Sequence, residues 1–508
     1  MEMNITKQSI SSYETIFEQT VEQAVDTDFT MPDYFPSIVR VLNCKILPRI
    51  ASKSVMNDTL SIDGSVLITV IYTDDEKKIR SYDQLVDFQK SIPVGELGDN
   101  PQIHISIAQD YANCRAITEK KIDVHGVLSI KIKIMSKKDR EILTDIDCDG
   151  IQIKRGSYPA TNPLGFTEKI VIIEEDLELS RNSGPIKTVL RNEAQAKVDQ
   201  CKLIGNKAVV KGELIINALY CTDEGKVEKY ENRIPFNQIV DINLEGENCE
   251  CDAEIKIMSS MLKPRTNLSG EAKSFAFESK LAVLVMTSCE NDVSIIYDAF
   301  CTKQKIKTEH CRVQFNKLSS KTNERFMCKK TLDFSENTFG TIVDMWCENK
   351  VNQIKITDGK LYLNGTSVIN ILVYDKDDQP QYFERNVDFE YSNDIADSSI
   401  SSIVESEITT TSCAFTVIDE TKLEVMVELC IATQIYTVQE VDVVTDADIC
   451  TAKDDSLVKK SPIVMYYANS GESIWDIAKT YNSDCLDIIN INKIDEDVLN
   501  RSRVLLIP

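Results

Sequence analysis

Residues 211–236 read KGELIINALYCTDEGKVEKYENRIPF and contain the pattern that decides the fold. An apolar run from Leu214 to Tyr220 meets a turn at Thr222-Asp223-Glu224-Gly225, and a second run ends at Phe236. Branched and aromatic residues that fold back over an Asp/Gly turn are typical of a β-hairpin. We therefore expect two antiparallel strands here.

The same pattern occurs twice more in the chain. Each copy has a glycine, an apolar run that ends in tyrosine, an acidic turn and two further aromatic residues. The third copy has one extra residue after its glycine and one fewer in its turn. The aligned positions are Gly64, Tyr72, Tyr82 and Phe88; Gly212, Tyr220, Tyr230 and Phe236; and Gly365, Tyr374, Phe383 and Phe389.

The spacing of the copies predicts the domain organisation. Tyr72, Tyr220 and Tyr374 lie about 150 residues apart, which is the size of a domain and much longer than a solenoid repeat. Because helical periodicity is scarce and short runs alternate with turns, we predict a mainly β fold of three repeated β-sandwich or barrel-like domains. The predicted divisions are domains at 1–160, 161–308 and 309–452, a linker at 453–462 and a small α+β domain at 463–508.

Other segments of the chain recur with the hairpin. Each copy is predicted to begin with a strand, to hold a long alternating run in its second half and to close with an apolar step into an aspartate. A linker is predicted at Ser157–Pro163, and a weakly marked boundary near Lys303–Cys311. The recurring segments are 16–25, 169–179 and 325–334; 122–134, 275–286 and 415–431; and Leu143-Thr144-Asp145, Ile296-Tyr297-Asp298 and Val444-Thr445-Asp446.

The charge balance is acidic, with 57 Lys and Arg against 81 Asp and Glu and a net charge of −24. This balance argues against nucleic acid and against an anionic membrane surface as partners, because both need a basic surface. Solubility is the simplest explanation of the charge, and a basic protein partner is the alternative. Residues 1–30 lack an apolar core with a cleavage site, and no apolar run reaches 18 residues, so we expect neither a signal peptide nor membrane insertion.

The chain has 16 cysteines and no CxxC pair. Cys44, Cys114 and Cys148 of the first copy do not line up with the cysteines of the second copy, Cys201, Cys221 and Cys289. A disulfide framework would tend to recur with the repeat. We therefore expect free thiols in a reducing cytosol, where they act as small apolar residues.

The last segment, 463–508, differs from the repeats. A strand at Val464–Tyr467 leads to Ser473, which is predicted to cap a helix that runs to about Tyr481. Ser483 or Asp484 is expected to cap a second helix, and residues 504–507 predict a closing strand. The predicted order is β-α-α-β.

These residues resemble a LysM domain at Tyr467, Gly471, Ile474–Ala478, Asn492 and Leu505–Pro508. LysM domains bind N-acetylglucosamine polymers through the loop around a Gly-Asp-Thr and the loop after the second helix. The first loop here is Gly471-Glu472-Ser473, and Ser502 replaces the usual late glycine. The resemblance implies that Gly471, Glu472, Ser473 and Asn492 are glycan-loop positions, and the departures imply at most weak peptidoglycan binding.

The three repeats resemble the SPOCS domain of spore-coat proteins. Three such repeats before a LysM tail are similar to the architecture of clostridial spore-coat morphogenetic proteins. The resemblance implies a non-enzymatic scaffold or adaptor in coat assembly, in the mother-cell cytoplasm at the forespore surface. It also implies that the LysM domain docks to the morphogenetic ATPase of the coat basement layer, and that other coat proteins are partners.

A search for chemistry supports a non-enzyme. The sequence has neither a GxxxxGK[ST] phosphate loop nor a GxSxG nucleophile elbow. His104, His125 and His310 stand apart and do not recur, and the acidic turns lack the spacing of a calcium loop. We predict no catalytic residue, no cofactor and no metal.

Trp475 and Ile463 are the predicted partner-binding residues. Trp475 is one of two tryptophans, and it lies at the edge of the buried helical face. It would either pack beside the first strand or act as an exposed aromatic anchor, the residue type enriched at interface hot spots. Ile463, just before the strand, would extend the same patch.

Two other functions remain open alongside the scaffold. The chain would instead bind peptidoglycan of the spore cortex or cell wall, or it would be an unrecognised hydrolase. Exposed strand edges in the repeats would support self-association or partner binding by strand addition.

Overall fold

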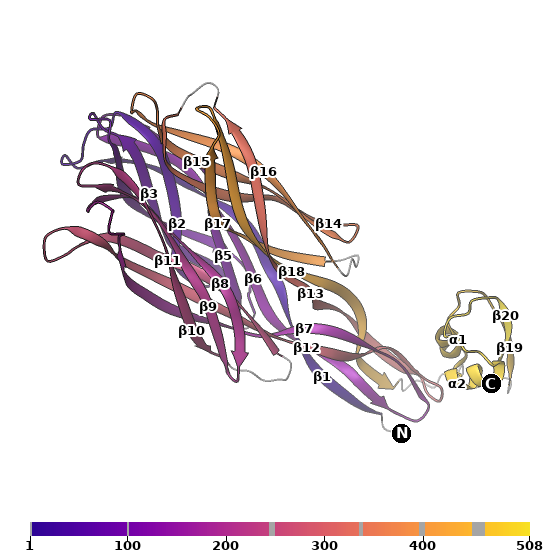
Figure 1. Ribbon diagram of the computed structural model, residues 1–508. Helices are drawn as coiled ribbons and strands as arrows, with labels where there is room; N and C mark the ends of the chain where they lie inside the picture. Colours follow the sequence, from indigo (N-terminus) through magenta and orange to yellow (C-terminus); the bar gives the residue numbers. More distant parts are fainter. Residues whose placement is uncertain (1–2, 99–100, 243–248, 335–338, 396–401, 450–462) are drawn as a thin grey trace.

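The computed structural model describes residues 3–98, 101–242, 249–334, 339–395, 402–449 and 463–508. Figure 1 shows long tilted strands in an elongated bundle, with a small helical module at one end. Within these ranges the only helices are two short ones near the C terminus, so the mainly β prediction is confirmed. None of the described helices has the length and apolar character needed to cross a bilayer.

Each repeat contributes six strands within the described ranges. The first has β1 (Asn4–Thr30), β2 (Arg40–Met56), β3 (Thr59–Thr73), β4 (Ile79–Pro93), β5 (Gln102–Ala116) and β6 (Lys121–Asp147). The second has β7 (Ile151–Glu178), β8 (Ile186–Ile204), β9 (Lys207–Thr222), β10 (Val227–Asp241), β11 (Cys249–Thr266) and β12 (Ala272–Cys301). The third has β13 (Ile306–Asp333), β14 (Thr341–Thr357), β15 (Lys360–Tyr374), β16 (Pro380–Asp394), β17 (Ser402–Val417) and β18 (Lys422–Ile449).

The six strands of a repeat form two antiparallel sheets. In the first repeat the orders are β2-β3-β4 and β1-β6-β5, and the other two repeats follow the same orders. Apolar residues from both sheets fill one core, for example Ile68 and Tyr72 of β3 with Ile122 and Leu128 of β6. Each repeat is therefore a β-sandwich, one of the two architectures that the sequence predicted, and not a barrel.

The recurring glycine lies directly across from the recurring phenylalanine in each hairpin: Gly64 with Phe88, Gly212 with Phe236 and Gly365 with Phe389. The ring covers the glycine from the side. A Cβ atom added at Gly212 would lie 2.2 Å from the Lys197 carbonyl oxygen and 2.6 Å from the Phe236 ring. Glycine is needed here because two backbones and a ring approach closely, which explains why the pair recurs.

Tyr374 differs from the tyrosines with which it aligns. Tyr72 and Tyr220 are buried in the cores of their own repeats. The extra residue after Gly365 shifts Tyr374 by one position, and neighbouring residues of a strand point to opposite faces. Val373 therefore takes the core position of the third repeat, and Tyr374 packs against a cluster between the repeats.

Two expectations about strand boundaries are wrong. The predicted linker at Ser157–Pro163 lies inside β7, whose residues 151–163 pair with β12 of the second repeat. The predicted strand at 415–431 is interrupted by a turn between β17 and β18. Proline and small residues suggested a linker, but pairing across a long hairpin overrides that local preference. The predicted linker at 453–462 lies outside the described residues.

The three repeats lie side by side around a shared axis rather than in line (Figure 1). Contacts close a ring, since β4 meets β8, β10 meets β14 and β16 meets β2. Equivalent apolar residues of the three repeats meet at the centre of the ring. The sheets that contain the hairpins (β2-β3-β4 and its equivalents) have edges that we expected to be exposed, but the neighbouring repeat covers them. We call the narrow end of the bundle beside the helical module the stem (Figure 1). The central residues are Leu42, Ile71, Leu190, Leu219, Trp346 and Leu372, and a second cluster toward the stem contains Leu143, Ile296 and Val444.

A buried ion pair joins the second and third repeats within this ring. Arg191 of β8 donates to the Asp344 carboxylate at 2.6 Å, and both side chains are almost fully buried. The Arg191 guanidinium also lies 4.4 Å from the centre of the Trp346 ring. Because neither charge can be solvated if its partner is lost, this pair fixes how the two repeats meet.

We expect Gly212→Ala to lower the free energy of unfolding by about 1–3 kcal/mol, since the added methyl would overlap a backbone carbonyl and a ring. Urea unfolding followed by circular dichroism would measure the change. Gly165→Ala is the control, because its Cβ would come no closer than 4.0 Å to Thr287 Oγ1. Equal midpoints for the two variants would contradict the close-approach argument.

Asp344→Ala should destabilise the protein by roughly 2–3 kcal/mol, because it removes the buried carboxylate that faces both Arg191 and Lys229 and leaves Arg191 only its partner Glu193 in the same strand. The control is Asp394→Ala, which removes an exposed partner of Lys360 and should leave the urea midpoint unchanged. A loss of stability no greater than that of the control would show that the buried pair does not join the repeats.

Candidate functional site: the C-terminal module

The C-terminal module folds as β19 (Val464–Ala468), α1 (Ile474–Tyr481), α2 (Cys485–Asn492) and β20 (Arg503–Ile507). The predicted β-α-α-β order is confirmed. Ser473 caps α1 by accepting from the Trp475 backbone N–H at 3.1 Å, and Asp484 caps α2 in the same way. Ile474, Ile477 and Ala478 form the buried face of α1, as their spacing predicted.

Trp475 contacts the second repeat instead of the solvent. Its ring packs against Phe300 of β12 with the ring centres 5.0 Å apart, and its indole N–H donates to the Asp298 carboxylate at 2.9 Å. Lys479, one turn further along α1, donates to the same carboxylate at 2.7 Å. The sequence placed Trp475 at the edge of the buried face, but neither of the two predicted environments included the second repeat.

Asp298 is presented to the module by a bulge in β12. The register shifts at Tyr297, and the Asp298 side chain accepts from the Ala299 backbone N–H at 2.9 Å. The same bulge precedes Asp145 and Asp446 in the other repeats, which explains the recurring apolar step into an aspartate. Those two carboxylates pair with Arg155 and Lys7, whereas Asp298 pairs with the module.

Burial by itself would raise the pKa of Asp298, but the hydrogen bonds from Lys479 and Trp475 outweigh burial and hold the pKa below its ordinary value of 3.8. A second contact lies nearby, where the Gln152 amide donates to the Asp484 carboxylate at 2.8 Å. Phe300 completes the apolar core of the module. The module is thus docked on the second repeat by the apolar contact with Phe300 and by hydrogen bonds to two side chains, Asp298 and Gln152.

Three of the predicted glycan-loop residues, Gly471, Glu472 and Ser473, precede α1, whereas Asn492 is the last residue of α2. Glu472 accepts from the Asn469 amide at 3.2 Å and from the Tyr466 hydroxyl at 3.0 Å, and these bonds, the Asn469 bond first, lower the pKa of Glu472. The Asn492 side chain bonds the Leu506 backbone on both its N–H and its carbonyl, at 2.7 Å each. Gly471 has φ +91 and donates to the Leu499 carbonyl. These groups are therefore engaged in holding the fold.

The outer face of the two-stranded sheet is apolar and exposed. Met465 lies across from Leu506 and Tyr467 across from Val504, and all four side chains point away from the core. Ile463, which precedes β19, is also exposed. We call this set, Ile463, Met465, Tyr467, Val504 and Leu506, the outer face. Sequence reasoning found only Ile463, although alternation along both strands marks the other four.

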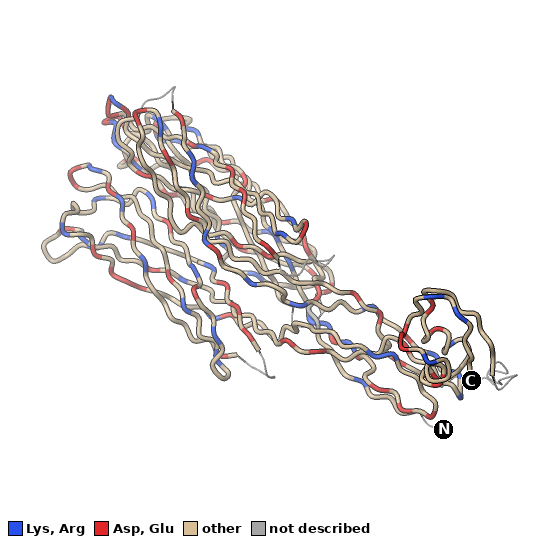
Figure 2. Tube along the Cα trace, turned by 45° about the vertical axis from the view of Figure 1, so that its right-hand side comes forward, with Lys and Arg blue, Asp and Glu red and all other residues tan. Residues whose placement is uncertain are grey.

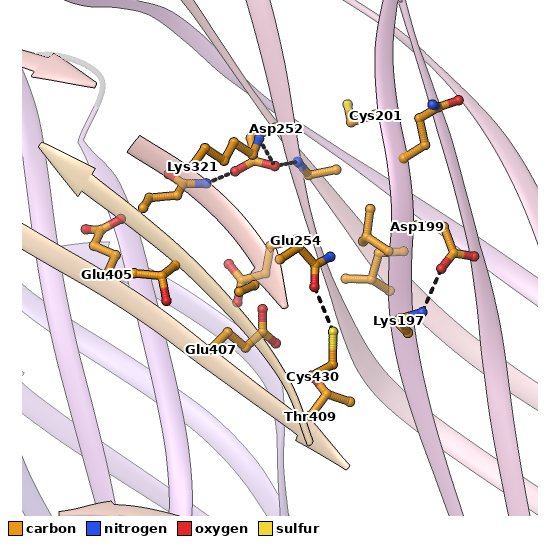
Figure 3. Close-up of a pocket in the computed structure, with 18 of the residues that line it drawn as sticks. Lys197, Asp199, Cys201, Asp252, Glu254, Lys321, Glu405, Glu407, Thr409 and Cys430 are labelled. Atoms are coloured by element: carbon orange, nitrogen blue, oxygen red, sulfur yellow. Dashed lines mark hydrogen bonds and ion pairs between the residues drawn. The ribbon is translucent and has the colours of Figure 1, made fainter. Parts of the chain in front are cut away.

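A cavity of about 530 Å³ separates the second and third repeats (Figure 3). Carboxylates gather in it from both repeats, and burial followed by the nearby Glu254 raises the pKa of Glu407. Lys321 pairs with Asp252 at 3.0 Å. Across the part of the chain that is described, no group of three or more His, Cys, Asp or Glu side chains is placed to hold a metal ion. Acidic and basic residues are interspersed along the traced chain (Figure 2).

Two kinds of domain are recognised by comparison with known families. Residues 37–117 and 185–263 match the family model described as SipL, SPOCS domain, and they cover β2–β5 of the first repeat and β8–β11 of the second. Residues 466–508 match the LysM domain. The chain therefore combines SPOCS domains with a C-terminal LysM domain, as the sequence predicted. No curated protein and no solved structure matches the chain.

This combination associates the chain with bacterial sporulation and the spore coat. The family model that matches its SPOCS segments is that of SipL. Neither the SPOCS nor the LysM domain is a catalytic family. The LysM match associates the tail with peptidoglycan binding. The third repeat shares the strand order of the two matched repeats.

Asp298→Ala is expected to weaken docking of the module by about 1–2 kcal/mol, because it removes charge-assisted hydrogen bonds to Trp475 and Lys479. Fluorine NMR of 5-fluorotryptophan-labelled protein should show the Trp475 signal moving toward that of an exposed indole while Trp346 is unchanged. Since the pKa of Asp298 is lowered, the contact is fully present above pH 3.8 and is lost as the pH falls through its docked pKa.

The matched control is Asp292→Ala, which changes an exposed aspartate in the same strand. If Asp298→Ala leaves both tryptophan signals in place, Asp298 does not hold the module.

Proposed function

We propose that the chain is a non-enzymatic scaffold of the bacterial spore coat that docks through its LysM domain to the morphogenetic ATPase of the coat basement layer. The observation that carries the proposal is the outer face of β19 and β20. Five apolar side chains are exposed there on a module whose own core is already complete. A contiguous exposed apolar patch of this kind is typical of a protein-binding surface.

The composition of the outer face favours a protein over a sugar polymer. Tyrosine and methionine are enriched at protein interfaces, where a flat apolar centre is excluded from water by a polar rim. The glycan-loop residues offer few free polar groups to a sugar, since the Glu472 carboxylate and the Asn492 amide are already hydrogen-bonded within the module. A protein partner would bury surface that the fold leaves open.

Trp475 would join the docking surface only after its release from Asp298. In the docked state its ring is covered by Phe300 and its N–H is bonded. A partner that uses Trp475 must therefore compete with the second repeat for the same face of α1. We assign Ile463 to the outer face and Trp475 to a second contact that opens when the module undocks.

The ring of repeats would supply a rigid platform for this module at the forespore surface, in the mother-cell cytoplasm. Their strand edges in the hairpin sheets are covered by neighbouring repeats. Other coat proteins and self-association are therefore assigned to the outer faces of the sheets. Apolar side chains such as Leu85, Ile239 and Ile172 are exposed there.

The double variant Ile463→Glu/Tyr467→Glu should lower capture of the purified ATPase at least tenfold, because a charge in a desolvated apolar contact costs more than about 1.4 kcal/mol. Leu486→Glu is the control, since Leu486 is an equally exposed apolar residue on α2. Circular dichroism would verify the fold of both variants. Capture by the double variant at the level of the control would overturn the outer face as the docking site.

Trp475→Glu and Asp298→Ala test whether Trp475 contacts the ATPase in addition to the outer face. If Trp475 contacts the ATPase, the first variant weakens capture and the second strengthens it. If both weaken capture, the docked arrangement itself is what the partner recognises, and Trp475 is not a direct contact.

The second candidate function is peptidoglycan binding, which the LysM match favours. Sedimentation of the full chain with purified peptidoglycan distinguishes it from the scaffold. Strong, saturable binding that is lost in Gly471→Trp, which would crowd the first loop, supports the glycan function. Capture of the ATPase without such sedimentation supports the scaffold.

A further inference from the structure

Three pairs of cysteines bridge the sheets of the three sandwiches. Each pair joins the first strand of the hairpin sheet to the edge strand of the opposite sheet in the same repeat. The Cys201 and Cys251 sulfur atoms are in direct contact, Cys44 and Cys114 pack in the same core cluster, and Cys347 and Cys413 line the same cavity. The pairs are Cys44 of β2 with Cys114 of β5, Cys201 of β8 with Cys251 of β11, and Cys347 of β14 with Cys413 of β17.

The geometry of the second pair is the closest to a covalent bond. The Cys201 and Cys251 sulfur atoms lie 2.7 Å apart, against roughly 2.05 Å in a disulfide. A small movement of either edge strand would bring the sulfurs to bonding distance. In the other two pairs the two cysteines also pack against the same core, Cys44 with Cys114 in the first repeat and Cys347 with Cys413 in the third.

The three cysteine pairs lie at different positions along the equivalent strands of the three repeats. Cys44 lies across from Val70, Cys201 across from Val210 and Cys347 across from Ile369, which are different distances from the recurring glycine of each hairpin. A cysteine pair therefore joins the equivalent two strands in every repeat, although the cysteines stand at different positions in the aligned sequences. Three separate placements of one link argue against a chance meeting of small apolar residues.

The two sulfur atoms of each pair differ in pKa, and the one with the lower pKa deprotonates first. The hydrogen bond from Cys44 lowers the pKa of Cys114, that from Cys201 lowers the pKa of Cys251, and that from Cys413 lowers the pKa of Cys347. Its partner in each pair has a raised pKa and keeps its proton. A thiolate beside a thiol is the arrangement from which disulfides form.

We propose that these three pairs are oxidation sites, at which hydrogen peroxide converts each dithiol to a disulfide that fastens the two sheets of a repeat along one edge. The thiolate attacks one peroxide oxygen, the O–O bond breaks, and the departing hydroxide takes up a proton to give water. The resulting sulfenic acid is attacked by the partner sulfur, the S–O bond breaks, and the partner's proton leaves with the oxygen as a second water. Two thiols are oxidised, and the peroxide is reduced.

Cavities give a small oxidant access to two of the pairs. Cys347 and Cys413 line a cavity of about 650 Å³ between the second and third repeats. Cys201 lines the cavity of Figure 3, and Cys251 lines another beside it. Cys44 and Cys114 are both partly exposed. Hydrogen peroxide is small enough to reach these sites without unfolding of the sandwich.

The structure contains one disulfide among the described residues, between Cys249 and Cys289, and this corrects the prediction that all cysteines are free thiols. It joins neighbouring strands of one sheet, β11 and β12, so it does not bridge the sandwich. The three proposed bonds differ because each closes a chain loop of roughly 50–70 residues between two sheets, which restricts the unfolded chain.

The test is to reduce the full chain, treat it with hydrogen peroxide, block free thiols and map peptides by mass spectrometry without reduction. Three crosslinked peptide pairs are expected in addition to 249–289, namely 44–114, 201–251 and 347–413, together with a higher urea midpoint than that of the reduced chain. The variant Cys114→Ser/Cys251→Ser/Cys413→Ser should lose most of that rise. Since it keeps Cys249 and Cys289, the remaining rise measures the disulfide already present.

Cys328→Ser is the control, because Cys328 is half-buried like the paired cysteines and packs against the core of the third repeat. It should retain all three crosslinks and the full rise. If the triple variant fails to fold, the single variant Cys114→Ser decides the matter by losing only the 44–114 crosslink. Unlinked or over-oxidised cysteines at all three pairs, or the same rise in the triple variant and the wild type, would overturn the proposal.

Discussion

The fold depends on the burial of a second apolar face in each repeat. A strand such as β3 turns Tyr72 into its own sandwich and Ile71 toward the other repeats, so a single repeat would leave Ile71 in water. The neighbouring repeats cover that face, with Leu219 and Leu372 at the equivalent positions. Because each repeat meets both others, the three sandwiches form a closed ring and share one centre.

The ring explains features that a string of independent domains would not have. The buried Arg191–Asp344 pair and the Lys45 ammonium between Glu193 and Glu348 lie only where repeats meet. Bulges recur before Asp145, Asp298 and Asp446, in the long strand pairs that form the stem. At the end of this stem the bulge aspartate of the second repeat is available to the LysM module.

The functional consequence is that the two sides of the LysM module are unequal. One side, with Trp475, is covered by Phe300 and Asp298 of the second repeat. The other side is the exposed outer face around Tyr467. In the scaffold that we propose, the outer face would be open to a partner at all times, and the surface around Trp475 would open only when the contact with Asp298 is lost.

The sequence by itself determined the mainly β class, the three hairpins with their recurring glycine and aromatic positions, and the β-α-α-β plan of the LysM module with Ser473 as the first helix cap. These features follow from local rules, since turn residues, alternation and capping act over a few positions. The tertiary structure alone decided the ring, the face toward which Tyr374 points, the contact of Trp475 with Asp298 and the pairing of the cysteines. Each of those depends on residues distant in sequence that meet only when sheets pack, and no spacing in the chain encodes which edge strand will lie beside which.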